Sequence, residues 1–161
     1  MSLGKPGMMT DEIADLDREF DPQLSLHIGR VVLAASECED ILLELLSVTY
    51  QVDEGYKNSV DVIPPNPWRT GAALTDALEK RLPRDWSHIA LRYRELSEKR
   101  NAIVHSSWIG NGHWPIGFRR RNEGYEVRSK VSLEALDLLA ADFLKFRQDV
   151  DSLISILLGI R

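Results

Sequence analysis

The chain has 161 residues, of which 43% are apolar and 28% charged, with 7 prolines and 10 glycines. This composition excludes a disordered or fibrous protein and predicts a single globular domain. The formal charge of −5 excludes a protein that coats nucleic acid with a wholly basic surface. The single cysteine, Cys38, cannot form an internal disulfide, which favours a reducing cytoplasm over a secreted scaffold.

The charge is distributed unevenly along the chain. The segment 92–130 contains 9 Lys or Arg residues and 4 Asp or Glu residues, whereas the remainder is strongly acidic. A basic zone on an acidic body attracts a polyanion to one place. The alternative interpretation is a solvated face that binds nothing.

No membrane span is predicted, because charged residues interrupt both long apolar-rich stretches, 31–46 and 133–158. Residues 1–9 have no signal-peptide pattern and are expected to be a flexible leader or a cloning remnant. The single domain is therefore expected over residues 10–161.

The first half of the chain predicts two helices and a loop. Apolar side chains recur with a 4-3-4-3 spacing over residues 24–49, which predicts a long helix that starts at Asp21 and Pro22. The segment 51–67 contains three prolines and predicts a surface loop. A short helix is predicted over residues 68–82.

The second half predicts two further helices and a hairpin. One helix is expected to start near Asp85 and to continue through Ser107. Two extended runs, 114–121 and 125–130, flank a turn and predict a β-hairpin. Ser132 is expected to cap the final helix. The predicted fold is mainly α: an antiparallel bundle of four to five helices with a small β-hairpin inserted before the last helix.

Polar side chains border the apolar stripe of the helix that contains residues 93–105. On an ideal helix Tyr93, Leu96, Ile103 and Val104 face the core, while four polar residues lie beside them and are expected to be partly desolvated, namely Ser97, Arg100, Asn101 and His105. Such positions are costly for polar groups, which suggests that they are used. The structural alternative is that Arg100 pairs with Glu39 or Asp40 and that His105 bonds a backbone carbonyl.

The run Arg100-Asn101-Ala102-Ile103-Val104-His105 resembles the Arg-x4-6-His motif of the HEPN superfamily, including the polar residue directly after the Arg. The resemblance covers residues 22–158 and its specificity rests on this one motif. It implies a helical bundle, often dimeric, that acts as a metal-independent endoribonuclease of toxin-antitoxin or defence type. The alternative is a non-catalytic HEPN-like module for binding nucleic acid or a nucleotide, or for dimerisation.

The resemblance implies a role for each polar residue. His105 would transfer protons and Arg100 would stabilise the charged phosphate, with Asn101 orienting one of them. The weaker substrate-binding candidates are Ser97, Ser106, Arg119, Arg120 and Arg121. One histidine per chain is short of the two proton-transfer groups that the reaction uses, so a homodimer with a shared cleft is expected, together with RNA and an antitoxin protein as partners.

The remaining candidates predict no further chemistry. The chain contains no Glu-x-x-His pair to complete a di-iron site, so neither a metal nor a cofactor is expected. Cys38 lies on an apolar stripe and is expected to be a buried hydrophobe and not a nucleophile. The tryptophans favour packing over base stacking, and three histidines have no partner at a recognised spacing: His27, His88 and His113.

Overall fold

The computed structural model describes residues 22–54, 70–109, 116–121 and 124–160. Its helices are α2 (Pro22–Glu54), α4 (Thr70–Arg81), the short 3-10 helix η1 (Arg84–Trp86), α5 (Ser87–Val104) and α6 (Leu133–Leu157). Its strands are β1 (Ser107–Ile109), β2 (Ile116–Arg121) and β3 (Gly124–Lys130). The leader expected at residues 1–9 and the helix cap expected at Asp21 lie outside the described residues.

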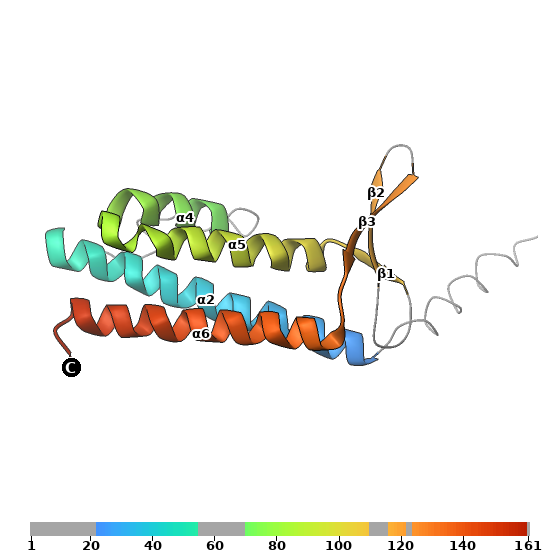
Figure 1. The fold of residues 1–161 in the computed structure, drawn as a ribbon. Helices are drawn as coiled ribbons and strands as arrows, with labels where there is room; N and C mark the ends of the chain where they lie inside the picture. Colours follow the sequence, from blue (N-terminus) through green and yellow to red (C-terminus); the bar gives the residue numbers. More distant parts are fainter. Residues whose placement is uncertain (1–21, 55–69, 110–115, 122–123, 161) are drawn as a thin grey trace, which may run out of the picture.

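The pairing of α2 with α6 forms the body of the molecule. The two helices run parallel to each other (Figure 1), with His27 near the start of α2 beside Asp137 near the start of α6, and they share the most extensive contact between any two elements described. The predicted antiparallel arrangement is therefore wrong for this pair. Helix α5 runs in the opposite direction and returns the chain to the end of the bundle where α2 begins (Figure 1). The predicted apolar stripe of α2 is confirmed: seven of its eight positions are buried, and Ile28 is partly buried and packed against them. The helix continues to Glu54, so residues 51–54 of the predicted loop are helical, and residues 55–67 of it lie outside the described residues.

The predicted final helix is confirmed with its cap. Ser132 has an extended backbone, and its side chain accepts a hydrogen bond of 3.0 Å from the backbone N–H of Ala135. The apolar side chains that α6 places against α2 and α5 are buried: Leu136, Leu139, Phe143, Phe146, Val150 and Leu153. Salt bridges add to this contact at its edges, as between Arg147 and Glu37 at 3.5 Å.

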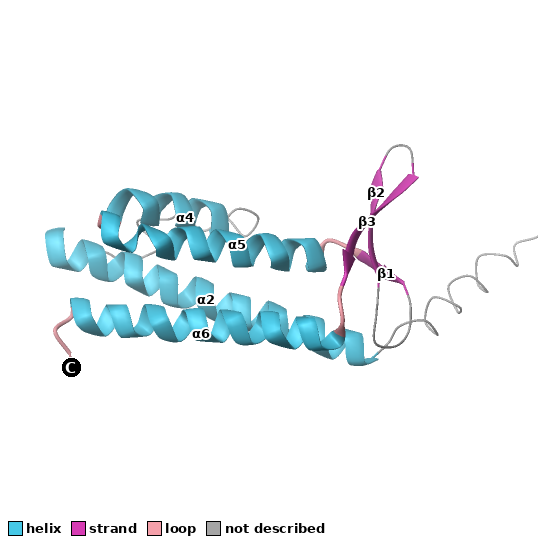
Figure 2. Cartoon of the chain, viewed as in Figure 1, coloured by secondary structure: helices cyan, strands magenta, loops and turns pink. Residues whose placement is uncertain are grey.

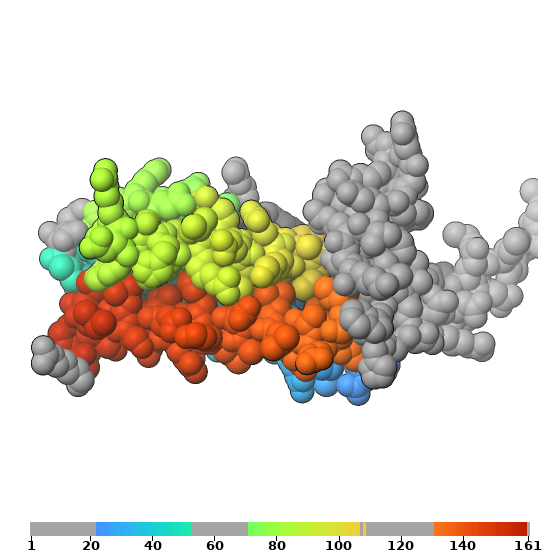
Figure 3. Space-filling view, in the orientation of Figure 1, coloured from blue at the N-terminus to red at the C-terminus, as the bar shows by residue number. Residues whose placement is uncertain are grey.

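Helices α4 and α5 complete the bundle. In the space-filling view of Figure 3, α5 and α6 lie side by side on the near face. The ring of Tyr93 on α5 stacks on Phe146 of α6 with 6.0 Å between centroids. On α4, Leu74 and Leu78 are fully buried, and the Arg81 guanidinium lies 3.8 Å above the Tyr50 ring of α2. The core therefore lies between all four helices.

The prediction of a lone two-stranded hairpin is wrong, although β2 and β3 correspond to its two strands and pair antiparallel. In place of a lone two-stranded hairpin, the described strands form a three-stranded antiparallel sheet in the order β1-β2-β3 at one end of the bundle (Figure 2). The extra strand pairs Ser107 with Phe118, and the β2 and β3 register places Phe118 opposite Val127. Three residues are too few to show the period-two alternation from which a strand is predicted, so the sequence pattern does not indicate β1 and extends the preceding helix through Ser107.

Helix α5 consequently ends earlier than predicted, at Val104 and not at Ser107. Its last carbonyl groups are bonded by the residues that follow: the His105 N–H donates to the Asn101 carbonyl, and the Trp108 indole N–H donates to the Ile103 carbonyl. The indole bond closes the helix and turns the chain into β1. Trp108 and Trp86 both pack against the core, as expected, whereas Trp68 and Trp114 lie outside the described residues.

Among the helices of the described ranges, none combines the length and the apolar character needed to cross a membrane.

The packing predicts a large cost for truncating the core of α6. Phe143 is fully buried in the core, so Phe143→Ala is expected to lower the free energy of unfolding by about 3–5 kcal/mol. The neighbouring Leu144 is 42% exposed, and Leu144→Ala is the matched control with an expected loss below about 1 kcal/mol. Urea unfolding followed by circular dichroism measures both values. Equal losses would contradict this packing.

Candidate functional site

A carboxylate on α2 organises the polar contacts of α5. Glu39 Oε1 accepts a hydrogen bond of 2.9 Å from the Tyr93 hydroxyl, and it lies 3.4 Å from Arg100 Nη2. Glu39 and Arg100 are each about one quarter exposed, at 26% and 25%. The contact therefore forms at the edge of the core, where solvent weakens it only in part. One carboxylate oxygen thus joins α2 to two positions of α5.

Helix α4 approaches this carboxylate through a glycine. A Cβ atom on Gly71 would lie 3.5 Å from Glu39 Oε1 and 3.6 Å from the Tyr93 hydroxyl. A methyl group would therefore be in van der Waals contact, and a longer side chain would lie against the carboxylate. We call Glu39, Gly71, Tyr93, Ser97 and Arg100 the Glu39 cluster.

Burial controls the ionisation of Tyr93. Its ring is 1% exposed, and desolvation raises the pKa of its hydroxyl well above the ordinary value. The negative charge of Glu39 raises the pKa further, while a hydrogen bond with Ser97 and the charge of Arg100 lower it. Tyr93 is thus a fixed donor to Glu39 and not an acid or base near neutral pH.

Arg100 keeps unused donors. The guanidinium has five N–H groups, of which Nη2 faces Glu39. Its Nε is buried and has no hydrogen-bond partner among the described residues. The expected pairing of Arg100 with a carboxylate of the first helix is therefore present, and it leaves part of the guanidinium open to solvent.

His105 lies at the C-terminal end of α5, where its backbone closes the helix and its side chain is exposed. The expected bond from the His105 ring to a backbone carbonyl is not seen among the described residues. A separation of five residues turns Arg100 and His105 about 140° apart on a helix. Within one chain the structure consequently does not bring these two side chains together.

The other predicted site residues of α5 differ in how far they are buried. Ser97 is half-buried beside Tyr93, as expected, whereas Asn101 and Val104 are exposed. The expectation that Asn101 and His105 are partly desolvated, and that Val104 faces the core, is wrong because α5 is uncovered on this side near its end. The Ser106 hydroxyl donates to the Ala102 carbonyl and so helps to end the helix.

The predicted basic residues Arg119, Arg120 and Arg121 form the last half of strand β2. Their backbones pair with β3, which places Arg120 opposite Tyr125. The sheet follows directly from the C-terminal end of α5 (Figure 2), so these three positions belong to the same end of the molecule as His105.

Sequence reasoning missed an ion-pair cluster between the starts of α2 and α6. His27 Nδ1 lies 2.6 Å from Asp137 Oδ1, and Arg30 Nη1 lies 3.3 Å from the same oxygen. Desolvation raises the pKa of the Asp137 carboxyl, but hydrogen bonds and charges from His27 and Arg30 outweigh it and hold that pKa below its ordinary value. The two helices are far apart in sequence, so no local spacing signals this contact.

Two further predictions concern the reactivity of Cys38 and the presence of metal ligands. Cys38 is fully buried, its thiol donates to the Phe143 carbonyl at 3.0 Å, and desolvation raises its pKa to about 12. The prediction of a buried, unreactive cysteine is confirmed. Within the ranges that the structure describes, no three His, Cys, Asp or Glu side chains are grouped as metal ligands. His113 lies outside those ranges.

Comparison with known proteins gives no relative: no family model, curated protein or solved structure matches the chain.

The Glu39 cluster predicts a pH-dependent cost of removing one hydroxyl. Tyr93→Phe is expected to lower the free energy of unfolding by about 1 kcal/mol at pH 7. Because the folded state holds the pKa of Tyr93 above its unfolded value, the native chain loses stability as the pH rises past 10.0. The difference between native chain and variant therefore shrinks at pH 11, as measured by urea unfolding.

A double-mutant cycle with Glu39→Gln supplies the control. The two substitutions are expected to be non-additive, whereas Tyr93→Phe combined with Asp40→Asn is additive, because Asp40 is exposed on the same helix and lies outside the Glu39 cluster. Additivity in both cycles would contradict the assigned hydrogen bond.

Proposed function

We propose that the protein is a HEPN-like, homodimeric, metal-independent endoribonuclease of toxin or defence type, in which Arg100 and His105 act on the RNA backbone. The observation that supports it is that a partly exposed guanidinium, oriented by Glu39, and an exposed imidazole both lie toward the C-terminal end of α5. Both groups are accessible to a phosphate, and both belong to the Arg-x4-His motif.

The chemistry needs no metal. The RNA 2′-hydroxyl attacks the adjacent phosphorus, the bond from phosphorus to the 5′-oxygen breaks, and a 2′,3′-cyclic phosphate and a 5′-hydroxyl result. One group must accept the proton of the 2′-hydroxyl and another must donate a proton to the leaving oxygen. His105 is proposed for proton transfer, Arg100 for stabilising the charge on the phosphate, and Asn101 for orienting the imidazole.

A second copy is required in this proposal, because Arg100 and His105 of one chain point in different directions and only one imidazole is supplied. Exposed apolar side chains lie on the elements that would form the dimer contact. Val104 precedes His105 on α5, and Val32 and Leu33 precede Glu39 on α2, which runs antiparallel to α5 (Figure 1). The described part of α4 begins near Glu39 and does not extend over this surface.

The proposal also assigns RNA binding to the arginines of β2 and to two serines of the α5 region. The arginines 119–121 of β2 would hold RNA phosphates without reading sequence, and the half-buried Ser97 and Ser106 would serve as auxiliary binding positions. The single cysteine favours a cytoplasmic location. A nuclease of toxin type also requires a neutralising protein partner.

One observation favours a second candidate, a HEPN-like module that binds nucleic acid or a nucleotide, or that dimerises, without cleaving. Glu39 partly neutralises the charge of Arg100, which is the arrangement expected of a structural ion pair. In this alternative the same surface binds a polyanion, and His105 has no role in chemistry.

An RNA cleavage assay in the presence of EDTA distinguishes the two candidates. The native chain is expected to cleave, and His105→Ala is expected to lose about 10²- to 10⁴-fold in rate, as does Arg100→Ala. His88→Ala is the matched control, because His88 is exposed on the opposite end of the same helix. Equal rates for the native chain and His105→Ala would overturn the mechanism, and RNA binding without cleavage would favour the module.

The salt dependence of RNA binding tests the basic strand. Arg120→Ala is expected to weaken binding for all sequences alike and to reduce the slope of log Kd against log salt by about one phosphate contact. Arg84→Ala is the control, since this exposed arginine lies before α5 at the opposite end of the bundle. If both variants change the slope equally, RNA does not bind at the sheet.

A further inference from the structure

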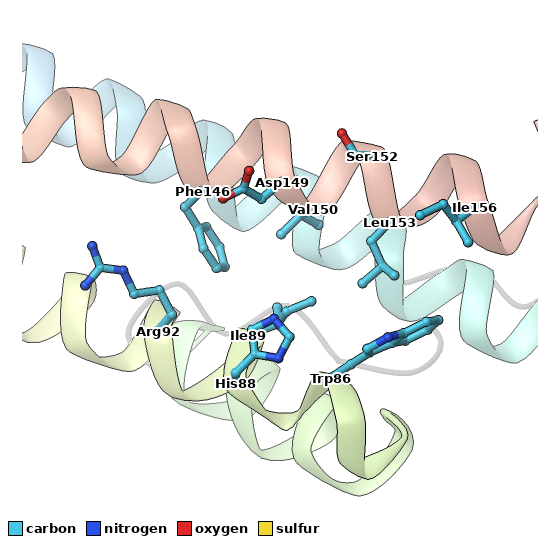
Figure 4. Close-up of a pocket in the computed structure, with 10 residues that line it drawn as sticks. All are labelled: Trp86, His88, Ile89, Arg92, Phe146, Asp149, Val150, Ser152, Leu153 and Ile156. Atoms are coloured by element: carbon cyan, nitrogen blue, oxygen red, sulfur yellow. The ribbon is translucent and has the colours of Figure 1, made fainter. Parts of the chain in front are cut away.

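A groove between α5 and α6 lies away from the proposed nuclease site. It has a volume of about 300 Å³, and it is open on one side. Its ten lining residues come from the end of η1, the start of α5 and the second half of α6 (Figure 4): Trp86, His88, Ile89, Arg92, Phe146, Asp149, Val150, Ser152, Leu153 and Ile156. On α5 the groove ends at Arg92, about 20 Å along the helix from His105.

The floor of the groove is apolar and fixed by the core. Ile89, Phe146 and Leu153 are buried beneath it, and the Trp86 ring lies across from Ile156 at one end (Figure 4). Ile156 itself is 69% exposed. Apolar exposure continues past the groove to Leu158 and Ile160, where the described chain ends. An apolar strip of this kind marks an interaction surface.

The neutral groups of the rim accept hydrogen bonds. His88 Nδ1 lies 3.0 Å from the Asp85 carbonyl, which can only accept, so Nδ1 carries the proton and Nε2 of a neutral imidazole is an acceptor. The Ser152 hydroxyl donates its proton to the Gln148 carbonyl, which leaves its lone pairs as acceptors. A ligand in the groove would therefore have to supply donors.

The two charged residues that line the groove, Arg92 and Asp149, have ion-pair partners outside it, and the whole group contains two cations and three carboxylates. Arg92 lies 3.3 Å from Glu95 and 3.6 Å from Asp142, and Lys145 lies 3.2 Å from Asp149. Both cations already face carboxylates, and one carboxylate remains in excess. Counted with these partners, the edge of the groove carries one negative charge in excess, and it offers hydrogen-bond acceptors above an apolar floor.

We propose that this groove binds a basic amphipathic helix of a partner protein. The lining of α6 extends from Phe146 to Ile156, about 15 Å, which matches the apolar residues of two to three turns of a helix laid between α5 and α6. Lysine or arginine side chains beside that apolar stripe would pair with the excess carboxylate and donate to His88 and Ser152. The inference does not depend on RNA cleavage.

Charge argues against a second copy as the occupant. A two-fold contact through this groove would bring two acidic rims together, with no unpaired cation of the rim to offset them. A small molecule is also a poorer fit, because small-molecule sites enclose most of their ligand, whereas this groove is open on one side.

The test uses a synthetic fluorescein-labelled helix of about three turns with leucine on one face and lysine on the others. Fluorescence anisotropy is expected to show binding to the full chain, and a twin peptide with glutamate in place of lysine is expected not to bind. Ile156→Lys is expected to raise Kd about tenfold or more, because it removes apolar contact and adds repulsion.

Leu138→Lys is the matched control. Leu138 is 62% exposed on the same helix and outside the groove, so this variant introduces the same charge with an expected change in Kd below about twofold. Both positions are exposed, so both variants are expected to fold, as circular dichroism checks. Asp149→Asn is expected to weaken binding and to reduce its dependence on salt.

Three results would overturn the proposal. The first is equal loss of affinity in Ile156→Lys and Leu138→Lys, and the second is equal or absent binding of the two peptides. The third is a fall in the sedimentation mass of Ile156→Lys without loss of peptide affinity, which would assign the groove to a second copy of the chain.

Discussion

The carboxylate of Glu39 is the polar contact on which the arrangement of α5 depends. It accepts from the buried Tyr93 hydroxyl and faces Arg100, and Gly71 lets the start of α4 approach it closely. An unpaired carboxylate at this edge of the core would be costly, so α2 and α5 are held in one relative position. The same contact orients Arg100 toward α2 and leaves His105 exposed on another side of α5. Any RNA chemistry by both residues therefore needs a second chain.

The two ends of α5 have opposite surface chemistry. At the C-terminal end an exposed histidine is followed by a sheet whose middle strand contains three consecutive arginines. At the N-terminal end the groove shared with α6 has an apolar floor and an acidic rim. A polyanion is attracted to the first end and repelled by the second, while a basic helix has the reverse preference. The uneven charge of the sequence thus corresponds to the two separate binding surfaces that we propose on one small domain.

The sequence predicts the features that depend on local periodicity, namely the helices and their buried faces. The stripes of α2 and α6 place their apolar residues as expected, and Ser132 caps α6 as its position indicates. Contacts between distant segments give no such signal. The sequence offers Glu39 and Asp40 equally as partners of Arg100, and the structure shows that Glu39 is the partner. The His27–Asp137 pair joins helices at opposite ends of the sequence. The strand β1 was missed because it is too short to show alternation. The exposure of Val104 was missed because ideal helix angles do not show where a neighbouring helix stops covering α5.

The central claim is that Arg100 and His105 contact the same RNA phosphate, and NMR tests it most directly. The side-chain nitrogens of arginine and histidine would be labelled with 15N, and an oligonucleotide made uncleavable by a 2′-deoxy substitution would be added. The account predicts that the Arg100 guanidinium and His105 imidazole signals shift along one shared saturation curve, while His88 stays unchanged. A shift of only one of the two residues, or of neither at saturating oligonucleotide, would contradict it.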